Sequence, residues 1–362
     1  MSNFTNYKPN YAIHPGEDVA DFIGYRNWSQ RELAQRTGLH ENTISNIING
    51  KDSITSEVAE RFGRVFGMKK SFFINLQTLY DETLPRQTRI EETEILQKLS
   101  YREMVKYGWL PETKNTNEKI KNLYHFLGIA SLKSLSQIGA GAIAFRKKET
   151  SNFSQEALAL WLRKGELECL NLEIIDFDKK KLEATLDKIR SLTLRPFEGI
   201  RQELKEILLE CGVIICYTPK LTNSCVNGAS RWYGNNILIQ ISDSGKKEDI
   251  FWFTLFHELG HTLKHLYNTK KTSFVDLENS EEDDKEIEAD EFAKNILIPS
   301  SAYQSFIQKR QFTNIYIKGF SQETGVDEGI VVGRLCNENL LTFDKASKFR
   351  KKLEFIIPIL VV

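Results

Sequence analysis

The spacing of apolar and polar positions along the chain predicts mostly helices, with a short β-rich part beyond the middle. Residues 14–80 have the pattern of short helices joined by tight turns, and residues 81–195 that of longer, heavily charged helices. Two β-rich stretches follow, GVIICYTP at 212–219 and NNILIQIS at 235–242, each bounded by turn residues. An apolar helix is expected at about 248–268, and another helix, EIEADEFAKNIL, ends before a proline. The pattern predicts an α+β fold that is mostly helical.

The length of the chain indicates more than one domain. A chain of 362 residues exceeds what one ordinary hydrophobic core serves, so two or three domains are expected. The changes of pattern divide it into a helical N-terminal domain at 1–85, a helical connecting or dimerisation region at 86–195, a domain with the β-rich stretches at 196–305 and a helical segment at 306–362.

Composition and charge narrow the class of protein. The chain is 41% hydrophobic and 27% charged, as is typical of a soluble globular protein. Its formal net charge of zero argues against a protein that binds nucleic acid over its whole surface. It permits one local DNA-binding face. There is neither the apolar segment of a signal peptide nor a run of about 18 apolar residues. The five cysteines form no CxxC pair, which fits reduced thiols. We therefore expect a cytoplasmic protein without membrane association.

The segment WSQRELAQRTGLHENTISNIINGK at 28–51 predicts two short helices joined by a tight turn. Ser29 followed by Glu32 forms a capping box, so a helix begins there, and Gly38 ends it. A second helix begins after His40, carries isoleucines on one side and ends at Gly50. This pattern is that of a helix-turn-helix, in which the second helix enters the major groove of DNA.

The outward-facing residues of this segment can bond DNA. Amide, carboxylate and hydroxyl side chains at the start of the second helix can bond base edges, and these are Glu41, Asn42, Thr43 and Asn46. Gln30, in the first turn of the preceding helix, can bond a phosphate. A generic helical hairpin remains the alternative, because the motif is short. Residues 1–90 hold eleven Lys/Arg and ten Asp/Glu, so tight binding would need a homodimer.

The same segment resembles the helix-turn-helix of Cro/repressor (XRE) proteins. With IHPGEDVADF before it and ITSEVAERFGRVFGMKKSFFINLQTLYD after it, the wider frame at 7–82 is similar to HigA-type antitoxins. The resemblance implies DNA contacts for Gln30, Glu41, Asn42, Thr43 and Asn46. It also implies binding to a double-stranded DNA operator and a toxin as partner.

A second motif, HELGH at 257–261, predicts a metal site. Residues four apart in a helix lie on the same face, so His257 and His261 can both reach a zinc ion. Glu258 points one residue round, where it can take a proton from a zinc-bound water whose pKa the metal lowers toward about 7. Histidines on an apolar helix are often satisfied core residues instead. Burying two of them with a glutamate, however, requires a partner for the charge.

A catalytic zinc also needs a third protein ligand. His265 lies about 12 Å along the helix from His257, which suits a supporting or packing role better than coordination. Glu286 and Glu288 both lie on the next helix. The spacing of Glu286 and Asp290 places a ligand and a second carboxylate on one face, where Asp290 could accept the free N–H of a zinc-bound histidine.

FTLFHELGHTLKH followed by EIEADEFAKNILIP resembles the ImmA/IrrE family of metallopeptidases, which combine HExxH with a downstream glutamate. NGASRWYGNNILIQIS fits the strand before the motif helix, and the similarity covers about residues 195–300. The resemblance implies Zn²⁺ as cofactor, with His257, His261 and Glu286 as ligands, Glu258 as general base and Asp290 as support. The segment EGIVVGRLCNENLL resembles the tail of the subgroup that carries a helix-turn-helix.

Two functions follow from the combination. In the first, a DNA-bound regulator carries a zinc endopeptidase that cleaves a regulatory protein, with an extended substrate paired to an edge strand such as NILIQIS. Tyr233 is a weaker candidate for a second electrophile. In the second, a non-proteolytic, antitoxin-like repressor binds its operator and a partner protein, and its metal domain serves as sensor or stabiliser. Glu258 favours the first, because a purely structural zinc needs no base.

Overall fold

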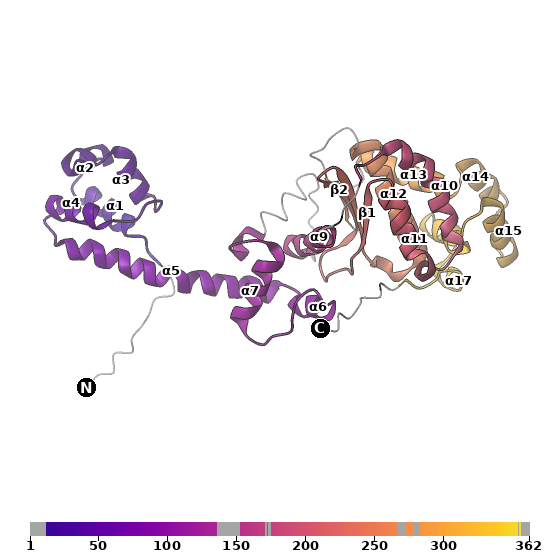
Figure 1. Cartoon of the computed structure of the whole chain (residues 1–362), viewed down its shortest axis with the longest axis horizontal. Coiled ribbons are helices and arrows are strands. Elements are labelled where there is room, and N and C mark those ends of the chain that lie inside the picture. The colour runs from indigo at the N-terminus through magenta and orange to yellow at the C-terminus, as the bar shows by residue number, and fades with distance from the viewer. Residues whose placement is uncertain are drawn as a thin grey trace. The chain divides into compact units, whose positions relative to one another are not determined.

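The computed structural model describes residues 12–135, 153–170, 172, 175–266, 273–277, 283–353 and 355. The chain packs into two compact units, Met1–Gln97 and Lys98–Val362. The fold is mostly helical with one small sheet, so the predicted α+β class is confirmed (Figure 1). Among the described residues, none of the helices combines the length and the hydropathy that spanning a bilayer requires.

The first unit is entirely helical in its described part. Its helices are α1 (Pro15–Tyr25), α2 (Gln30–Thr37), α3 (Glu41–Ile48), α4 (Ser56–Phe66) and α5 (Lys70–Lys98). Side chains from all five pack into one core that includes Leu33, Ile44 and Phe62. Helices α1 and α3 approach closely because residue 16 is a glycine: a Cβ there would lie 1.9 Å from the backbone oxygen of Ile47.

Local sequence explains where the helices of the first unit begin and end. The Ser29 hydroxyl accepts a hydrogen bond from the Glu32 amide at the start of α2, and Gly38 ends that helix with a left-handed φ of 66°. Helix α5 continues through Pro85 as far as Lys98. The limit expected at residue 85 therefore lies inside this helix.

The second unit begins with helices and continues into the sheet. Its earlier helical segments are α6 (Tyr101–Lys106), α7 (Thr116–Leu127), η1 (Leu132–Ser134), α9 (Gln155–Cys169), α10 (Lys179–Ser191), η2 (Leu192–Leu194) and α11 (Phe197–Leu209). Those after the first three strands are η3 (Ser244–Lys246), α12 (Glu248–His261), η4 (Thr262–Leu266), α13 (Asp284–Leu297), α14 (Ser300–Gln308), α15 (Asn314–Thr324), α16 (Glu328–Asn337) and α17 (Phe343–Ala346).

Four strands form the sheet in the order β1-β3-β2-β4. They are β1 (Val213–Tyr217), β2 (Val226–Tyr233), β3 (Asn236–Ile241) and β4 (Ser273–Leu277). Strand β3 pairs parallel with β1 and antiparallel with β2, and β4 pairs antiparallel with β2. Strand β3, which contains NILIQI, is therefore internal, and the expectation that it offers a free edge to a substrate is wrong. The edge beside the motif helix belongs to β4.

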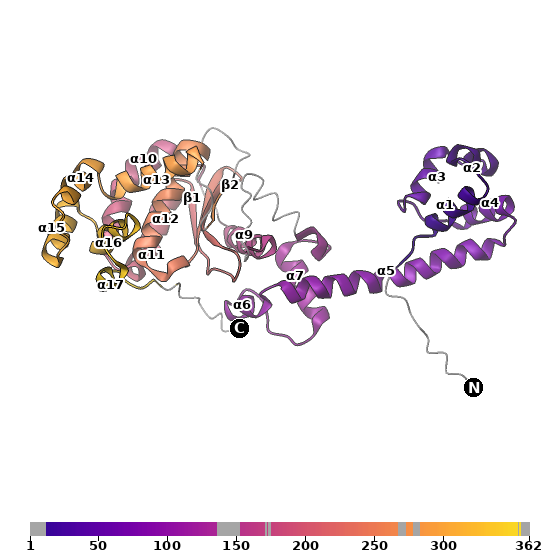
Figure 2. The same ribbon diagram turned by 180° about the vertical axis from the view of Figure 1, so that it is seen from behind.

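Helices cover both faces of the sheet. Helices α11 and α12 lie on one face and α9 on the other (Figures 1 and 2). The main core fills the α11–α12 side and continues into α16. Helix α12 is apolar nearly all round, as befits a helix enclosed by the sheet, α13 and α16. This enclosure places the HELGH residues inside the protein, next to the strands.

Candidate metal centre and nucleic-acid interface

Helix α12 presents two imidazoles to the same point. His257 and His261 are one helical turn apart and only 4% and 1% exposed. Their Nε2 atoms lie 3.0 Å from each other. The ring of His261 stacks on Phe274 of β4, with centroids 4.4 Å apart and planes inclined by 13°. Packing thus fixes the direction in which this imidazole points.

Helix α13 brings a carboxylate to the two imidazoles. One oxygen of Glu286 lies 3.2 Å from Nε2 of His257, and the other lies 2.9 Å from Nε2 of His261. The helices can approach because residue 260 is a glycine, where a Cβ would lie 3.2 Å from the Cα of Ala289. Asp283 caps α13 by accepting a hydrogen bond from the Glu286 amide. The first turn of α13, which carries the carboxylate, is thereby fixed.

The Nδ1 atom of each of these two imidazoles also has a partner. Nδ1 of His257 lies 2.9 Å from Asp290 Oδ1, and Nδ1 of His261 lies 3.0 Å from Nδ1 of His265. His265 lies in the π-helical turn η4, and its Nε2 lies 3.1 Å from Glu288. If both Nε2 atoms are to bind a metal through their lone pairs, each Nδ1 must carry the proton. The Nδ1–H of His257 can then donate a hydrogen bond to Asp290, and that of His261 can donate one to His265.

Nearby charges affect the His257–Asp290 pair in opposite directions. Burial lowers the pKa of His257, but the hydrogen bond with Asp290 and the charges of Asp276, Glu258 and Asp290 outweigh burial and raise it. Burial raises the pKa of Asp290, but the hydrogen bond with His257 and the charges of His257 and Lys294 outweigh burial and lower it. Asp290 is therefore a carboxylate, suited to accept the Nδ1 proton of His257.

Glu258 is fully buried beside the same imidazoles. A Cβ at Gly228 of β2 would lie 2.6 Å from Glu258 Oε1, so the glycine provides the space for this carboxylate. Asp276 of β4 completes a second group, in which ligand atoms of His257, Glu258 and Asp276 lie within 4.8 Å of one another. The sequence pattern did not single out Asp276 or Gly228. Asp276 lies in β4 (Ser273–Leu277), a strand outside the β-rich stretches predicted from the sequence.

The donor set suits zinc. His257, His261 and Glu286 each offer one ligand atom, and these atoms lie within 4.8 Å of one another in a buried site. Two imidazoles and one carboxylate are a ligand set that zinc accepts in catalytic sites. Tyr233, by contrast, packs against the cluster formed by Cys169, Ile214, Cys216 and Leu238, which lies on the α9 side of the sheet.

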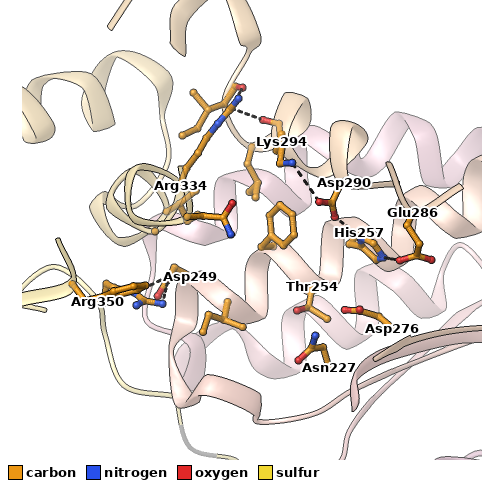
Figure 3. A pocket seen from close by; sticks show the side chains of 18 of the residues that line it. Asn227, Asp249, Thr254, His257, Asp276, Glu286, Asp290, Lys294, Arg334 and Arg350 are labelled. Carbon is orange, nitrogen blue, oxygen red and sulfur yellow. Dashed lines mark hydrogen bonds and ion pairs between the residues drawn. The ribbon is translucent and has the colours of Figure 1, made fainter. Parts of the chain in front are cut away.

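A pocket of about 550 Å³ opens from this centre and runs along α12 (Figure 3). Near the centre it is lined by His257, Glu286, Asp276 and Asp290. Farther along, its lining comes from the first half of α12 and from α16, and it includes Asp249, Ile330, Arg334 and Arg350. The centre is therefore reached through a cavity much larger than an ion requires.

Four of the predicted DNA-contacting residues lie in α3, three of them in its first turn, and Gln30 lies in the first turn of α2. Glu41 and Asn42 are exposed, whereas Thr43, Asn46 and Gln30 are half-buried. The Asn46 amide donates a hydrogen bond of 3.0 Å to Asp52, so this side chain would have to leave Asp52 to bond a base. Glu41 and Asn42 are the most accessible of the five.

Two family models match separate parts of the chain. The Helix-turn-helix model matches residues 26–73, and the IrrE N-terminal-like domain of the M78 peptidases matches residues 218–335. The first match contains helices α2, α3 and α4. The second runs from before β2 into α16 and contains His257, Glu258, His261 and Glu286.

Similar proteins match the first unit. An uncharacterized HTH-type transcriptional regulator of Haemophilus influenzae is 44% identical over 50 residues, which are 14% of this chain and 47%, about half, of that protein. Antitoxin HigA-1 of Vibrio cholerae is 30% identical over 79 residues, covering 22% of this chain and 74% of the antitoxin. The structure of Pseudomonas aeruginosa antitoxin HigA with the higBA promoter is 27% identical, covers 23% of this chain and 92% of that chain, and has a TM-score of 0.22.

Proposed function

Because the chain belongs to the XRE-type helix-turn-helix regulators related to HigA antitoxins and has an IrrE-like domain, we propose that it is an operator-binding regulator that hydrolyses a peptide bond in a regulatory protein. The operator, the zinc ion and the substrate are parts of this proposal. The convergence of His257, His261 and Glu286 beside the buried Glu258 is the observation that carries it.

The first unit supplies the proposed DNA contacts. Glu41 and Asn42 are exposed at the start of α3, where a recognition helix contacts base edges. Gln30 lies in the first turn of α2, where side-chain and backbone N–H groups suit a phosphate. A single unit with so little excess positive charge makes few phosphate contacts. We therefore propose that two copies bind two half-sites together.

The second unit supplies the proposed hydrolytic centre, with His257, His261 and Glu286 as holders of Zn²⁺. Zinc bound there would supply Lewis-acid chemistry, polarising a peptide carbonyl and making water at the site more acidic. Glu258 would take the proton from the attacking water and later give it to the leaving amine. Asp290 and His265 would hold the two imidazoles in the tautomer whose Nε2 faces inward.

The edge strand β4 offers a place for an extended substrate. Within the described sheet, β4 is an edge strand and pairs with β2. Asp276 and Leu277 of β4 line the pocket that opens from the centre. A peptide that adds to this edge by backbone hydrogen bonding would pass the buried centre, and we propose that it is cleaved there.

Replacing the proposed base tests the enzymatic function. The full-length protein with zinc would be incubated with the product of a neighbouring gene, with and without DNA from upstream of its own gene. Cleavage is expected for the wild type and for Glu291→Gln, whose side chain is exposed on α13, but not for Glu258→Gln. Zinc content and circular dichroism of Glu258→Gln must match the wild type.

The same experiment distinguishes the proposed peptidase from the alternative, a non-proteolytic repressor. A repressor that only binds DNA and a partner, with zinc as sensor or stabiliser, needs the histidines but not the base. If Glu258→Gln retains zinc and leaves the cellular effect unchanged, the peptidase proposal is wrong and the repressor remains. His257→Ala cannot make this distinction, because it removes a metal ligand in both cases.

A further inference from the structure

Two polar side chains in the pocket beside the proposed hydrolytic centre make no hydrogen bond within the described part of the chain. They are Asn227 of β2 and Thr254 of α12, and both line the pocket near His257 (Figure 3). Thr254 is 5% exposed and Asn227 is half-buried. Polar groups enclosed to this degree normally have a partner, because an unmade hydrogen bond costs free energy. Their place in the pocket indicates that the partner arrives with a ligand.

An irregularity of strand pairing turns Asn227 toward the pocket. The register of β2 against β4 shifts between Val226 and Gly228. Neighbouring residues of a regular strand point to opposite faces, and Gly228 faces α12, so Asn227 would point away from that helix. A bulge breaks this alternation and re-aims a side chain. The Asn227 carbonyl accepts a hydrogen bond of 2.8 Å from the Ser242 amide, so the backbone is held while the carboxamide lines the pocket.

The same strand sets the orientation of Thr254. A Cβ on Gly228 would lie 2.9 Å from Thr254 Cγ2, so the methyl group packs against β2. The hydroxyl does not bond the preceding turn of α12, whereas that of Thr262 donates to the Glu258 carbonyl at 2.9 Å. Three residues separate Thr254 from His257, about 4.5 Å along the helix axis. The hydroxyl and the Asn227 carboxamide both keep accessible surface, so a ligand in the pocket can reach them.

The charges of the pocket do not favour a charged ligand at these two residues. Its three cations are engaged in the ion pairs Lys294–Asp290 at 3.3 Å, Arg350–Asp249 at 2.7 Å and Arg334–Glu338 at 3.1 Å. Asp276 near the centre disfavours an acidic side chain. A lysine or arginine has donors only and would leave the N–H groups of Asn227 without an acceptor. A neutral group that both donates and accepts fits best.

The position of β2 in the sheet indicates that this group belongs to a long side chain. Strand β4 lies between β2 and the edge of the described sheet. A peptide paired to β4 would lie two strand spacings from β2, which is about 10 Å. Its backbone would not touch Asn227 at that distance. A side chain that ends in a carboxamide could, because two carboxamides facing each other span the gap.

We propose that Asn227 and Thr254 form a subsite for a glutamine side chain next to the cleaved bond. The carboxamides of Asn227 and of the glutamine exchange two hydrogen bonds, and the Thr254 hydroxyl donates to the glutamine oxygen. The inference rests on the proposed function, since it takes the pocket to be a substrate subsite. An aliphatic side chain of the same shape would leave both residues unpaired. A glutamate could not donate to Asn227 Oδ1.

Two series of zinc-anchored probes test this subsite by binding alone. N-acetyl amino acid hydroxamates place the side chain R on the acyl side of the anchor, and compounds HS–CH2–CH(R)–CO–NH–CH3 place it on the other side. In each series R is the glutamine side chain, the isosteric 3-methylbutyl group or the glutamate side chain. Calorimetry with the full-length, zinc-loaded protein should show, in at least one series, about 10-fold tighter binding of the glutamine probe than of both others.

Variants locate the effect. Asn227→Ala should abolish the preference for the glutamine probe over the 3-methylbutyl probe, and Thr254→Val, which exchanges the hydroxyl for a methyl group, should reduce it several-fold. Neither should lower the unfolding temperature or the affinity for acetohydroxamate, because the two side chains bond no other described residue. Asn235→Ala is the matched control, since Asn235 is exposed in the turn between β2 and β3 and does not line the pocket. It should keep the preference.

Equal affinities for the glutamine and 3-methylbutyl probes in both series would overturn the subsite, as would a preference that persists in folded Asn227→Ala or is lost equally in Asn235→Ala. If the variants do not fold, the ranking on the wild-type protein still decides. Binding of acetohydroxamate without any glutamine preference would leave the zinc centre standing, whereas no binding of any probe would overturn the centre and the subsite together. A glutamine preference without peptide hydrolysis would contradict only the peptidase proposal.

Discussion

Glu258 occupies the space that a side chain at residue 228 would fill. A Cβ on Gly228 would lie 2.6 Å from Glu258 Oε1, and 2.9 Å from a methyl carbon of Thr254. Strand β2 therefore limits where the glutamate can lie, and the absence of a side chain at 228 is what lets it lie against the strand. The position of the proposed base depends on a residue outside the HELGH motif.

Gly228→Ala should displace Glu258 and lower kcat about 100-fold, because a shift of about 1 Å at a reacting group is costly. Steady-state hydrolysis of a cleaved substrate, together with zinc content, measures the effect. Gly199→Ala is the matched control, since a Cβ at residue 199 would meet nothing within 4 Å. Unchanged kcat in Gly228→Ala would show that Glu258 is not the base or that it does not need this position.

Removal of zinc should destabilise the second unit and leave the first unchanged. Zinc at about 100 times its dissociation constant stabilises a folded domain by about 2.7 kcal/mol, which corresponds to roughly 5–10 °C for a domain of this size. Differential scanning calorimetry of the full chain with zinc and with chelator measures this shift. Glu286→Gln, which removes the anionic ligand, should reduce the shift. Identical transitions with zinc and with chelator would contradict a zinc site.

Part of the candidate site could be predicted from the sequence because its geometry is local. His257 and His261 share a face of α12 through the helical repeat alone. The position of Glu286 depends on how closely α13 packs on α12, which Gly260 and Ala289 determine through contact between helices. No periodic pattern contains this information, so Glu286 was favoured over Glu288 by its spacing to Asp290 and by resemblance.

For the sheet, too, the sequence predicts local features but not the arrangement in space. The predicted stretches at 212–219 and 235–242 contain β1 and β3, because β-branched residues and turn signals are local features. Their order is not local: β3 lies between β1 and β2, which makes it internal. Strand β4 has only five residues, Ser273–Leu277, and lies outside the β-rich stretches predicted from the sequence. The edge strand beside the motif helix is therefore the one that the sequence did not reveal.

His265 should support zinc binding through His261. Its Nδ1 lies 3.0 Å from Nδ1 of His261, and its Nε2 lies 3.1 Å from Glu288. His265→Ala removes the acceptor for the His261 proton and should weaken zinc binding about 10- to 100-fold, measured by competition with a chromophoric chelator. Glu288→Ala should have a smaller effect, because its side chain is 54% exposed.

Lys264→Ala is the control for that series, since Lys264 is an exposed neighbour of His265. Its zinc affinity should equal that of the wild type. If His265→Ala also binds zinc with wild-type affinity, the contact between the two imidazoles has no supporting role, and His265 is only a packing residue.

Asn42 should carry sequence preference in DNA binding. It is exposed in the first turn of α3, where an amide can bond an adenine, and each such contact contributes about 1–3 kcal/mol. Asn42→Ala should therefore lower affinity for the selected operator about 5- to 150-fold and leave binding to random DNA nearly unchanged, as measured by fluorescence anisotropy at fixed salt. Asn49→Ala is the control, because the Asn49 amide bonds the backbone oxygen of Ser45 at the other end of the helix. Equal losses on operator and random DNA would assign Asn42 to the DNA backbone, and no loss at all would remove α3 as the reading helix.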